Sequence, residues 1–332
     1  MPKPDEAHRL TDKELAALEK RIARVYREAR NDLQETINAY FERFRERDEK
    51  MKALIGTEVN GKVWTEQDYT FWRLNQIGRG ERYQALREKI AERMTRANEV
   101  ALAYVNDATP GIYTLNRNYA AYTIERVAGN VGFTLWDESA VKRLIKDKPD
   151  LMPYYPKKKA LKRGIDLKWG KKQITKSVTS GLLQGKSVGK IATDLQARVS
   201  KMNRASAVRA ARTAVTGAQN GGRMDSYKAA RQKGIELQKE WMATLDGRTR
   251  HSHRRLDGEV VDYNEEFSNG CRYPGDPRGK PGETYNCRCT LVARVKGVDT
   301  SDALRRDRHG GLPNMTFAQW EKQKRGEGYL QE

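Results

Sequence analysis

The sequence is poor in cysteine and contains no long apolar run. Three cysteines in 332 residues are too few for a disulfide scaffold, and an odd number fits a reducing compartment or a metal site. No apolar run approaches the ~20 residues that a transmembrane helix needs. The opening residues, MPKPDEAHRL, lack the apolar core of a signal peptide. We therefore expect no membrane partner and no Sec-type secretion.

Acidic residues are scarce in one part of the chain. The net charge is +20, but residues 1–150 hold 27 Lys and Arg against 25 Asp and Glu, residues 151–250 hold 23 against 6, and residues 251–332 hold 14 against 13. A basic excess confined to one region indicates a polyanionic partner, either nucleic acid or an acidic protein surface. A merely solubilising surface is the alternative.

The first cations of this basic region are the candidates for contacts with DNA phosphates. They are Lys157, Lys158, Lys159, Lys162, Arg163, Lys168, Lys171 and Lys172. Nothing resembles a recognition helix with base-reading residues. Contacts with DNA would therefore be non-specific and sensitive to salt.

Long helices are predicted for the N-terminal part. Apolar residues recur at steps of three and four from Leu15 to Phe44, and no Pro or Gly interrupts residues 11–55. Thr11 to Glu14 has the pattern of a capping box, which would start the helix. Two more helical stretches, 81–106 and 113–127, are separated by the predicted breaker Thr109-Pro110-Gly111. We interpret residues 1–128 as a helical assembly arm without a catalytic constellation.

The rest of the chain mixes helices with a few strands. Shorter helices are predicted at 137–146, 171–184, 187–199 and 315–324, an Ala-rich helix at 203–233, and strands at 235–244, 259–263 and 290–295. The fold class is therefore α+β and mostly helical, with a long N-terminal arm and a C-terminal domain of helices packed on a small antiparallel sheet. The predicted segments are the arm (1–128), a basic linker region (129–170), this domain (171–297) and a polar tail (298–332).

Polar and turn-forming residues are densest between residues 241 and 290. Asp246, His251, His253 and Asp257 lie within twelve positions, and all three cysteines follow in the same stretch. Such a segment needs side-chain hydrogen bonds, a metal or the surrounding domain to hold its backbone. On the preceding Ala-rich helix, Arg212, Thr216, Asn220 and Arg223 share one polar face. We expect that face to dock against the polar segment.

Four separate blocks resemble the phage head-morphogenesis (MuF-type) minor capsid protein family. The matching residues are Trp241, Asp246, Arg248, Arg250, His253, Leu256-Asp257-Gly258, Pro274-Gly275-Asp276-Pro277 and Asn286-Cys287-Arg288-Cys289. Arg212 and Thr213 resemble a further block of that family, although Ala214 stands where members often carry an acidic residue. With Asn220, these residues form the predicted structural motif. The departure at Ala214 weakens any role for this helix in supplying a catalytic carboxylate.

The resemblance implies a non-enzymatic minor head protein of a tailed phage or prophage. In that family such proteins associate with the portal during procapsid assembly, and some are tied to DNA packaging or ejection. The implied partners are the portal protein, capsid or scaffold proteins and double-stranded DNA. The implied locations are the virion and, during assembly, the host cytoplasm.

Two alternatives remain open at this stage. A structural zinc would be held by Cys271, Cys287 and Cys289 together with His253, or with His251 in its place, since thiolates and imidazole are its usual ligands. Otherwise the cysteines are small, buried, reduced side chains. Asp246, His251, His253 and Asp257 would suit a metal-dependent nuclease or a toxin-like effector. A hydrogen-bonded network, with Asp246 accepting from Arg248 or Arg250, explains the same residues without catalysis.

Overall fold

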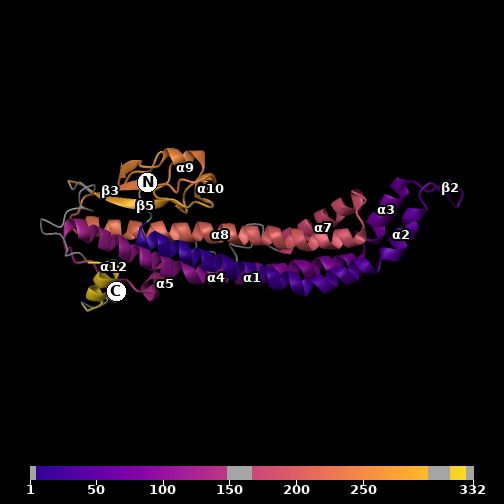
Figure 1. The fold of residues 1–332 in the computed structure, drawn as a ribbon, viewed down its shortest axis with the longest axis horizontal. Helices are drawn as coiled ribbons and strands as arrows, with labels where there is room; N and C mark the ends of the chain where they lie inside the picture. Colours follow the sequence, from indigo (N-terminus) through magenta and orange to yellow (C-terminus); the bar gives the residue numbers. More distant parts are fainter. Residues whose placement is uncertain (1–4, 148–166, 298–314, 327–332) are drawn as a thin grey trace. The chain divides into compact units, whose positions relative to one another are not determined.

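The computed structural model describes residues 5–147, 167–297 and 315–326 (Figure 1). They form two compact units, which we call unit 1 (Met1–Glu19, Val105–Tyr154 and Arg209–Glu332) and unit 2 (Lys20–Tyr104 and Tyr155–Val208). Three long helices, α1 (Glu6–Glu42), α4 (Glu81–Ala128) and α8 (Val188–Gln232), contribute residues to both. The units therefore cut across the four segments predicted along the chain. The mostly helical α+β fold class is confirmed.

Unit 2 is a bundle of helices with one small β-hairpin. Besides its parts of the three long helices it contains α2 (Arg45–Ala53), β1 (Glu58–Val59), β2 (Lys62–Val63), α3 (Glu66–Gln76) and α7 (Leu167–Leu183). The apolar stripe predicted from the N-terminal sequence forms its core, where Ile22, Ile37 and Ile90 are almost fully buried. The described helices include none that is long and apolar enough to cross a membrane.

Unit 1 combines helices with a three-stranded antiparallel sheet. Its strands β3 (Leu237–Met242), β4 (Val260–Asp262) and β5 (Thr290–Val295) are ordered β4-β3-β5, with Trp241 opposite Leu291. The three predicted strands are confirmed, and β3 buries alternate residues, as expected for a strand with one covered face. The short helices α9 (His251–Arg255) and α10 (Pro281–Thr284) lie beside β3 and β5 (Figure 1).

Two further helices complete unit 1. Helix α5 (Glu138–Asp147) agrees with its predicted range. Helix α12 (Phe317–Gly326) packs against α4 through Trp320, whose indole N–H donates to the fully buried carboxylate of Glu125 over 2.7 Å. Tyr122 of α4 donates to the Met315 carbonyl just before α12. Tyr122 thus packs α4 against the start of α12.

The predicted start of the first helix is wrong. The helix begins at Glu6, because the Asp5 carboxylate caps it by accepting from the His8 amide over 2.8 Å. Thr11 lies inside the helix, where its hydroxyl donates to the Ala7 carbonyl and accepts from the side-chain amide of Asn116. The helix is therefore capped by Asp5 and not by the predicted Thr11.

Two predicted helix breaks are absent. Helix α4 continues through Pro110, since Val105, Ile112 and Tyr113 on either side are buried and hold it in place despite the lost backbone hydrogen bond. Helix α8 runs through residues 200–203 without interruption. No Pro or Gly lies between Gly189 and Gly217 to stop it.

Helix α3 was missed by the sequence analysis. Its capping box is clear in retrospect: the Thr65 hydroxyl accepts from the Asp68 amide, and the Asp68 carboxylate accepts from the Thr65 amide. The turn Asn60-Gly61 in front of it connects β1 and β2 as a hairpin.

Candidate functional site

Trp241 is the centre around which the polar segment is folded. Its side chain is fully buried, and its ring meets the rings of Phe267 and His253 edge-on, with centroids 5.1 and 5.3 Å away. The backbone of Trp241 also pairs with Gly258 and Glu259. Gly258 adopts φ +81°, which a residue with a side chain rarely allows. The Trp, His and Leu-Asp-Gly blocks therefore meet in one place.

Asp246 fastens the loop after β3 to the start of β5. Its two carboxylate oxygens accept from the two terminal nitrogens of Arg288, each over 2.6 Å, and Oδ1 also accepts from the Arg248 amide. The hydrogen bonds from Arg288 hold the pKa of Asp246 well below its usual range. The guanidinium that pairs with Asp246 is therefore that of Arg288, and neither Arg248 nor Arg250 donates to it through its side chain. Arg250 donates instead to the Tyr285 carbonyl.

Asp257 and Asp276 fix turns in the same way. The Asp257 carboxylate accepts from the Ala243 amide over 2.8 Å. Asp276 is almost fully buried and accepts from the backbone and guanidinium of Arg272 and from the Arg278 amide. Burial by itself raises the pKa of Asp276, but the hydrogen bonds from Arg272 and Arg278 outweigh it and lower the pKa.

The polar face of α8 docks onto this segment through Asn220. The Asn220 side chain is fully buried, donates to the carbonyls of Pro274 and Cys289, and accepts from the Leu291 amide over 2.8 Å. Thr213 accepts from the Asn286 amide, and Asn286 itself adopts the left-handed φ of +53°. Arg212 is the exception, because it pairs with Glu19.

His253, Cys287 and Cys289 form a compact buried centre. One ligand atom from each lies within 4.8 Å of the others, with His253 Nδ1 3.7 Å from Cys287 Sγ and 3.4 Å from Cys289 Sγ. Hydrogen bonds from the Cys287 thiol and from His253 lower the pKa of Cys289, whereas burial raises the pKa of Cys287. Cys271 is not a member of this centre. It is fully buried elsewhere, and burial raises its pKa to about 12.

Glu283 is the residue of this centre that the sequence analysis missed. Its Oε2 lies 3.1 Å from His253 Nε2, on the side of the ring opposite the cysteines. Ser252 and Asn269 donate to the same carboxylate. A signal was available, since Glu283 is the only acidic residue between Asp276 and Thr290.

The nuclease constellation does not assemble. Among the described residues, the only cluster of three or more His, Cys, Asp or Glu ligands is the one at His253. Asp246 and Asp257 are engaged in the turns described above, and His251 is exposed. These four residues therefore do not converge on one ion.

Three of the candidate phosphate-binding residues are described, and they border a cleft in unit 2. Lys168, Lys171 and Lys172 lie in the first two turns of α7 and line a cleft of about 590 Å³ together with Arg87 and Leu167. Lys171 is paired with Glu88. Lys157, Lys158, Lys159, Lys162 and Arg163 lie outside the described residues.

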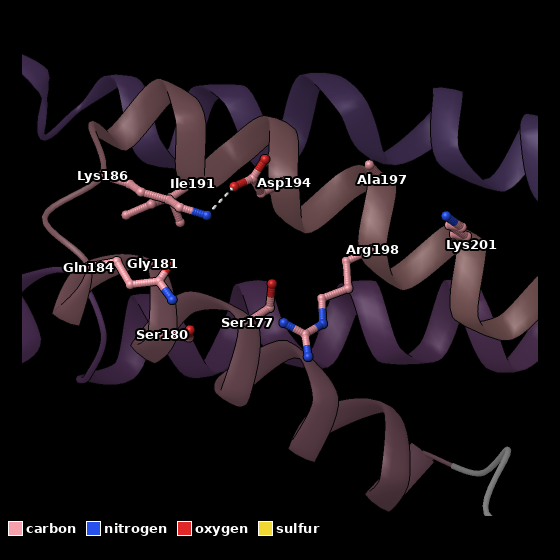
Figure 2. Close-up of a pocket in the computed structure, with 10 residues that line it drawn as sticks. All are labelled: Ser177, Ser180, Gly181, Gln184, Lys186, Ile191, Asp194, Ala197, Arg198 and Lys201. Atoms are coloured by element: carbon pink, nitrogen blue, oxygen red, sulfur yellow. Dashed lines mark hydrogen bonds and ion pairs between the residues drawn. The ribbon is translucent and has the colours of Figure 1, made fainter.

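A second cleft in unit 2 was not foreseen. It has a volume of about 440 Å³ and lies between α7 and the beginning of α8, where Ser177, Gln184, Arg198 and Lys201 line it (Figure 2). Lys186 at its end is paired with Asp194 over 2.8 Å. The sequence signal for it is the basic run that continues past residue 172.

Comparison with known proteins finds one family model and two relatives that resemble this chain. Residues 172–292 match the family described as "Phage Mu protein F like protein". The chain is also 26% identical to "Minor head protein GP7" of Bacillus phage SPP1 over 339 aligned residues, which cover 98% of this chain and 99% of the relative. Residues 172–292 therefore resemble the MuF-type head-morphogenesis family, and the chain as a whole resembles a minor head protein. No solved structure matches it.

A second relative covers less of either chain. "NAD(+)--arginine ADP-ribosyltransferase EFV" of Enterococcus faecalis (strain ATCC 700802 / V583) is 36% identical over 136 residues, which are 40% of this chain and 27% of that protein. Most of that protein thus lies outside the match.

Proposed function

We propose that this protein is a minor head protein of a tailed phage or prophage, which associates with the portal during procapsid assembly and contacts DNA in packaging or ejection. The observation that carries the proposal is the similarity to a minor head protein over 98% of this chain and 99% of that relative. A shared activity confined to one module would not require an alignment of that extent.

The geometry of the family blocks supports a scaffold rather than a catalyst. Trp241, His253, Asp276 and Asn220 are each at most 3% exposed. The polar side-chain atoms of Asn220 and Asp276 are engaged with neighbouring backbone and side chains, as described above. A catalytic group must reach its substrate, whereas these residues face the interior of unit 1. The segment therefore gives a rigid shape to a surface that other head proteins would contact.

Exposed apolar side chains of unit 2 are the candidates for contact with the portal or another head protein. The three most exposed large ones in the described chain are Phe71 (64%), Leu183 (60%) and Val63 (56%). Exposed apolar side chains of this size favour protein contacts. Phe71→Ser and Leu183→Ser should leave unfolding unchanged but lower incorporation into procapsids. Leu245→Ser, at an exposed loop position of unit 1, is the matched control. Normal incorporation of the two unit 2 variants would refute this surface.

The basic surface of unit 2 is the candidate for DNA contact. Residues 167–208 contain nine Lys and Arg and one acidic residue, Asp194. Six of these cations are exposed and form no ion pair within the described chain: Lys168, Lys172, Lys176, Arg198, Lys201 and Arg204. Arg198 and Lys201 border the serine-lined cleft of Figure 2, which offers hydroxyl and guanidinium donors to phosphate oxygens.

Salt dependence tests the DNA contact quantitatively. If all six cations reach phosphates of duplex DNA, the logarithm of the affinity should fall with the logarithm of salt concentration with a slope of about −5. Replacing Lys168, Lys172, Arg198 and Lys201 with Ala should make the slope less negative by about 3 to 4. Replacing the exposed Lys13, Lys20, Lys50 and Lys52 instead should leave it unchanged. No binding to duplex DNA at low salt would contradict this part of the proposal.

We also propose that the protein is not an enzyme. It should cleave neither DNA nor RNA in the presence of Mg²⁺, Mn²⁺ or Zn²⁺. It should transfer no ADP-ribose from labelled NAD⁺ to arginine, the activity named for the Enterococcus relative. Cleavage that is lost in His253→Ala would replace this proposal with the nuclease alternative, and ADP-ribose transfer would replace it with that of a toxin-like effector.

A further inference from the structure

The buried centre of unit 1 has the donors of a metal site. Its three ligand atoms are one imidazole nitrogen and two sulfurs, and all three side chains are at most 2% exposed. Thiolate and neutral imidazole are the donors that select zinc over hard cations such as Mg²⁺ and Ca²⁺. We propose that His253 Nδ1, Cys287 Sγ and Cys289 Sγ bind one zinc ion, with Glu283 as a positioning residue. This inference does not rest on the proposed function.

The distances fit tetrahedral coordination. With Zn–S near 2.3 Å and Zn–N near 2.0–2.1 Å, the edge between a sulfur and a nitrogen ligand of a tetrahedral ion is about 3.6 Å. The two edges that involve His253 Nδ1 are 3.7 Å to Cys287 and 3.4 Å to Cys289. The side chains thus need little movement to accept the ion. Three protein donors leave the fourth corner for a water or another exogenous ligand.

Glu283 occupies the place of an outer carboxylate. A histidine that binds metal through one nitrogen commonly directs the other toward a carboxylate, which fixes the ring and raises the basicity of the ligand. Glu283 Oε2 lies 3.1 Å from the far nitrogen of His253, and Ser252 and Asn269 hold the carboxylate in turn. The His253 ring is therefore already oriented with Nδ1 toward the sulfurs.

Local backbone geometry also favours two sulfur ligands here. Cys287 and Cys289 flank one residue at the start of β5, and the Cys289 amide lies 3.5 Å from Cys287 Sγ. An amide N–H directed at sulfur stabilises thiolate charge. The centre connects α9 to the start of β5, which lies more than thirty residues further along the chain. The two helices beside it are very short, because α9 has five residues and α10 has four. A bound ion would cross-link a part of unit 1 that has little regular structure.

A catalytic cysteine would make the same side-chain contacts, but it is not compatible with the burial of Cys289 and His253. His253 lies between the sulfur of Cys289 and the carboxylate of Glu283, in the order of a nucleophile, a base and an orienting group. However, Cys289 and His253 are each 2% exposed. No substrate carbonyl can approach that sulfur. The geometry therefore points to a structural ion.

Metal analysis of the full-length protein tests the proposal, with Cys271 as a matched control. Protein purified without chelator or a metal-affinity tag, and reconstituted with one equivalent of zinc, should retain about one zinc per chain after desalting. Cys271→Ser also removes a buried thiol and should retain the zinc, whereas Cys287→Ser and Cys289→Ser should lose it. Less than half an equivalent in the wild-type protein would overturn the proposal, and so would equal retention by all three variants.

Cobalt substitution covers the case in which the cysteine variants fail to fold. Cobalt added to metal-free wild-type protein should produce the intense visible bands of tetrahedral Co²⁺ and the near-ultraviolet bands of sulfur-to-cobalt charge transfer. The weak spectrum of octahedral cobalt would refute the site. Glu283→Gln should keep the bands but weaken binding in competition with a chelator by 10- to 100-fold. Unchanged affinity would refute the positioning role of Glu283.

Discussion

Replacing Gly222 with Ala should destabilise the protein, although helix propensity alone predicts the opposite. Gly222 lies in α8 where that helix crosses α4 within unit 1. A Cβ at this position would lie 2.4 Å from the Tyr113 carbonyl oxygen and 3.1 Å from the Arg117 amide nitrogen. Both are backbone atoms, so no side chain can rotate away. To restore even a 3.0 Å contact, the two helices would have to separate locally by about 0.6 Å.

The magnitude follows from two opposing effects. Ala is favoured over Gly inside a helix by about 1 kcal/mol. Overpacking costs about 1 to 3 kcal/mol, and a clash with rigid backbone falls at the upper end of that range. The separation would also stretch the hydrogen bond from the Ser226 hydroxyl to the Arg117 carbonyl, which is 2.5 Å long. We expect a net loss of about 2 kcal/mol in the free energy of unfolding.

Gly189 provides a matched control on the same helix. A Cβ there would meet no atom within 4 Å, so Gly189→Ala should be neutral or stabilising by up to about 1 kcal/mol. Denaturant unfolding followed by far-ultraviolet circular dichroism measures both variants. If Gly222→Ala is as stable as Gly189→Ala, the close helix crossing is wrong.

Three further predictions concern buried polar contacts of unit 1. Arg223→Met should cost about 3 kcal/mol in denaturant unfolding, because it removes the charged donor that pairs with the Asp5 carboxylate and with the Leu291 carbonyl. A cost below about 1 kcal/mol would contradict the contact. Burial raises the pKa of Asp5, but the charge and hydrogen bonds of Arg223 lower it below 3.8. The stability from this pair should therefore be complete above about pH 4 and decline as pH falls, and this decline should be less steep in Arg223→Met. An equal loss of stability with falling pH in both proteins would refute the pairing. Glu125→Ala removes the acceptor of the Trp320 indole and should speed amide hydrogen exchange throughout α12; unchanged protection would show that α12 docks by other contacts.

Much of the fold follows from local sequence patterns. The β-branched and alternating residues of the three segments in unit 1 predicted its strands correctly. The polar face of α8 was also predicted from the sequence, because Thr216 and Asn220 lie on one side of an Ala-rich helix. Helix boundaries were less predictable. Pro110 usually ends a helix, but buried neighbours on both sides carry α4 through it.

The candidate metal centre depended on contacts that sequence spacing does not encode. Cys271 lies in the same loop-rich segment as the other two cysteines and is equally buried, yet the fold directs it away from His253. Glu283 reaches His253 because the one-turn helix α10 brings it back across thirty residues. Asp5, near the N-terminus, likewise pairs with Arg223, which lies far away in the sequence. Such long-range pairs follow from tertiary packing.

The proposed role of this chain as a structural component of a phage head can be tested on assembled particles. The most direct measurement is quantitative mass spectrometry of density-gradient-purified procapsids and mature heads from a phage or induced prophage that encodes it. We expect the protein in both, at a low and fixed ratio to the major capsid protein. Its recovery only in fractions free of capsids would refute a structural role in the head.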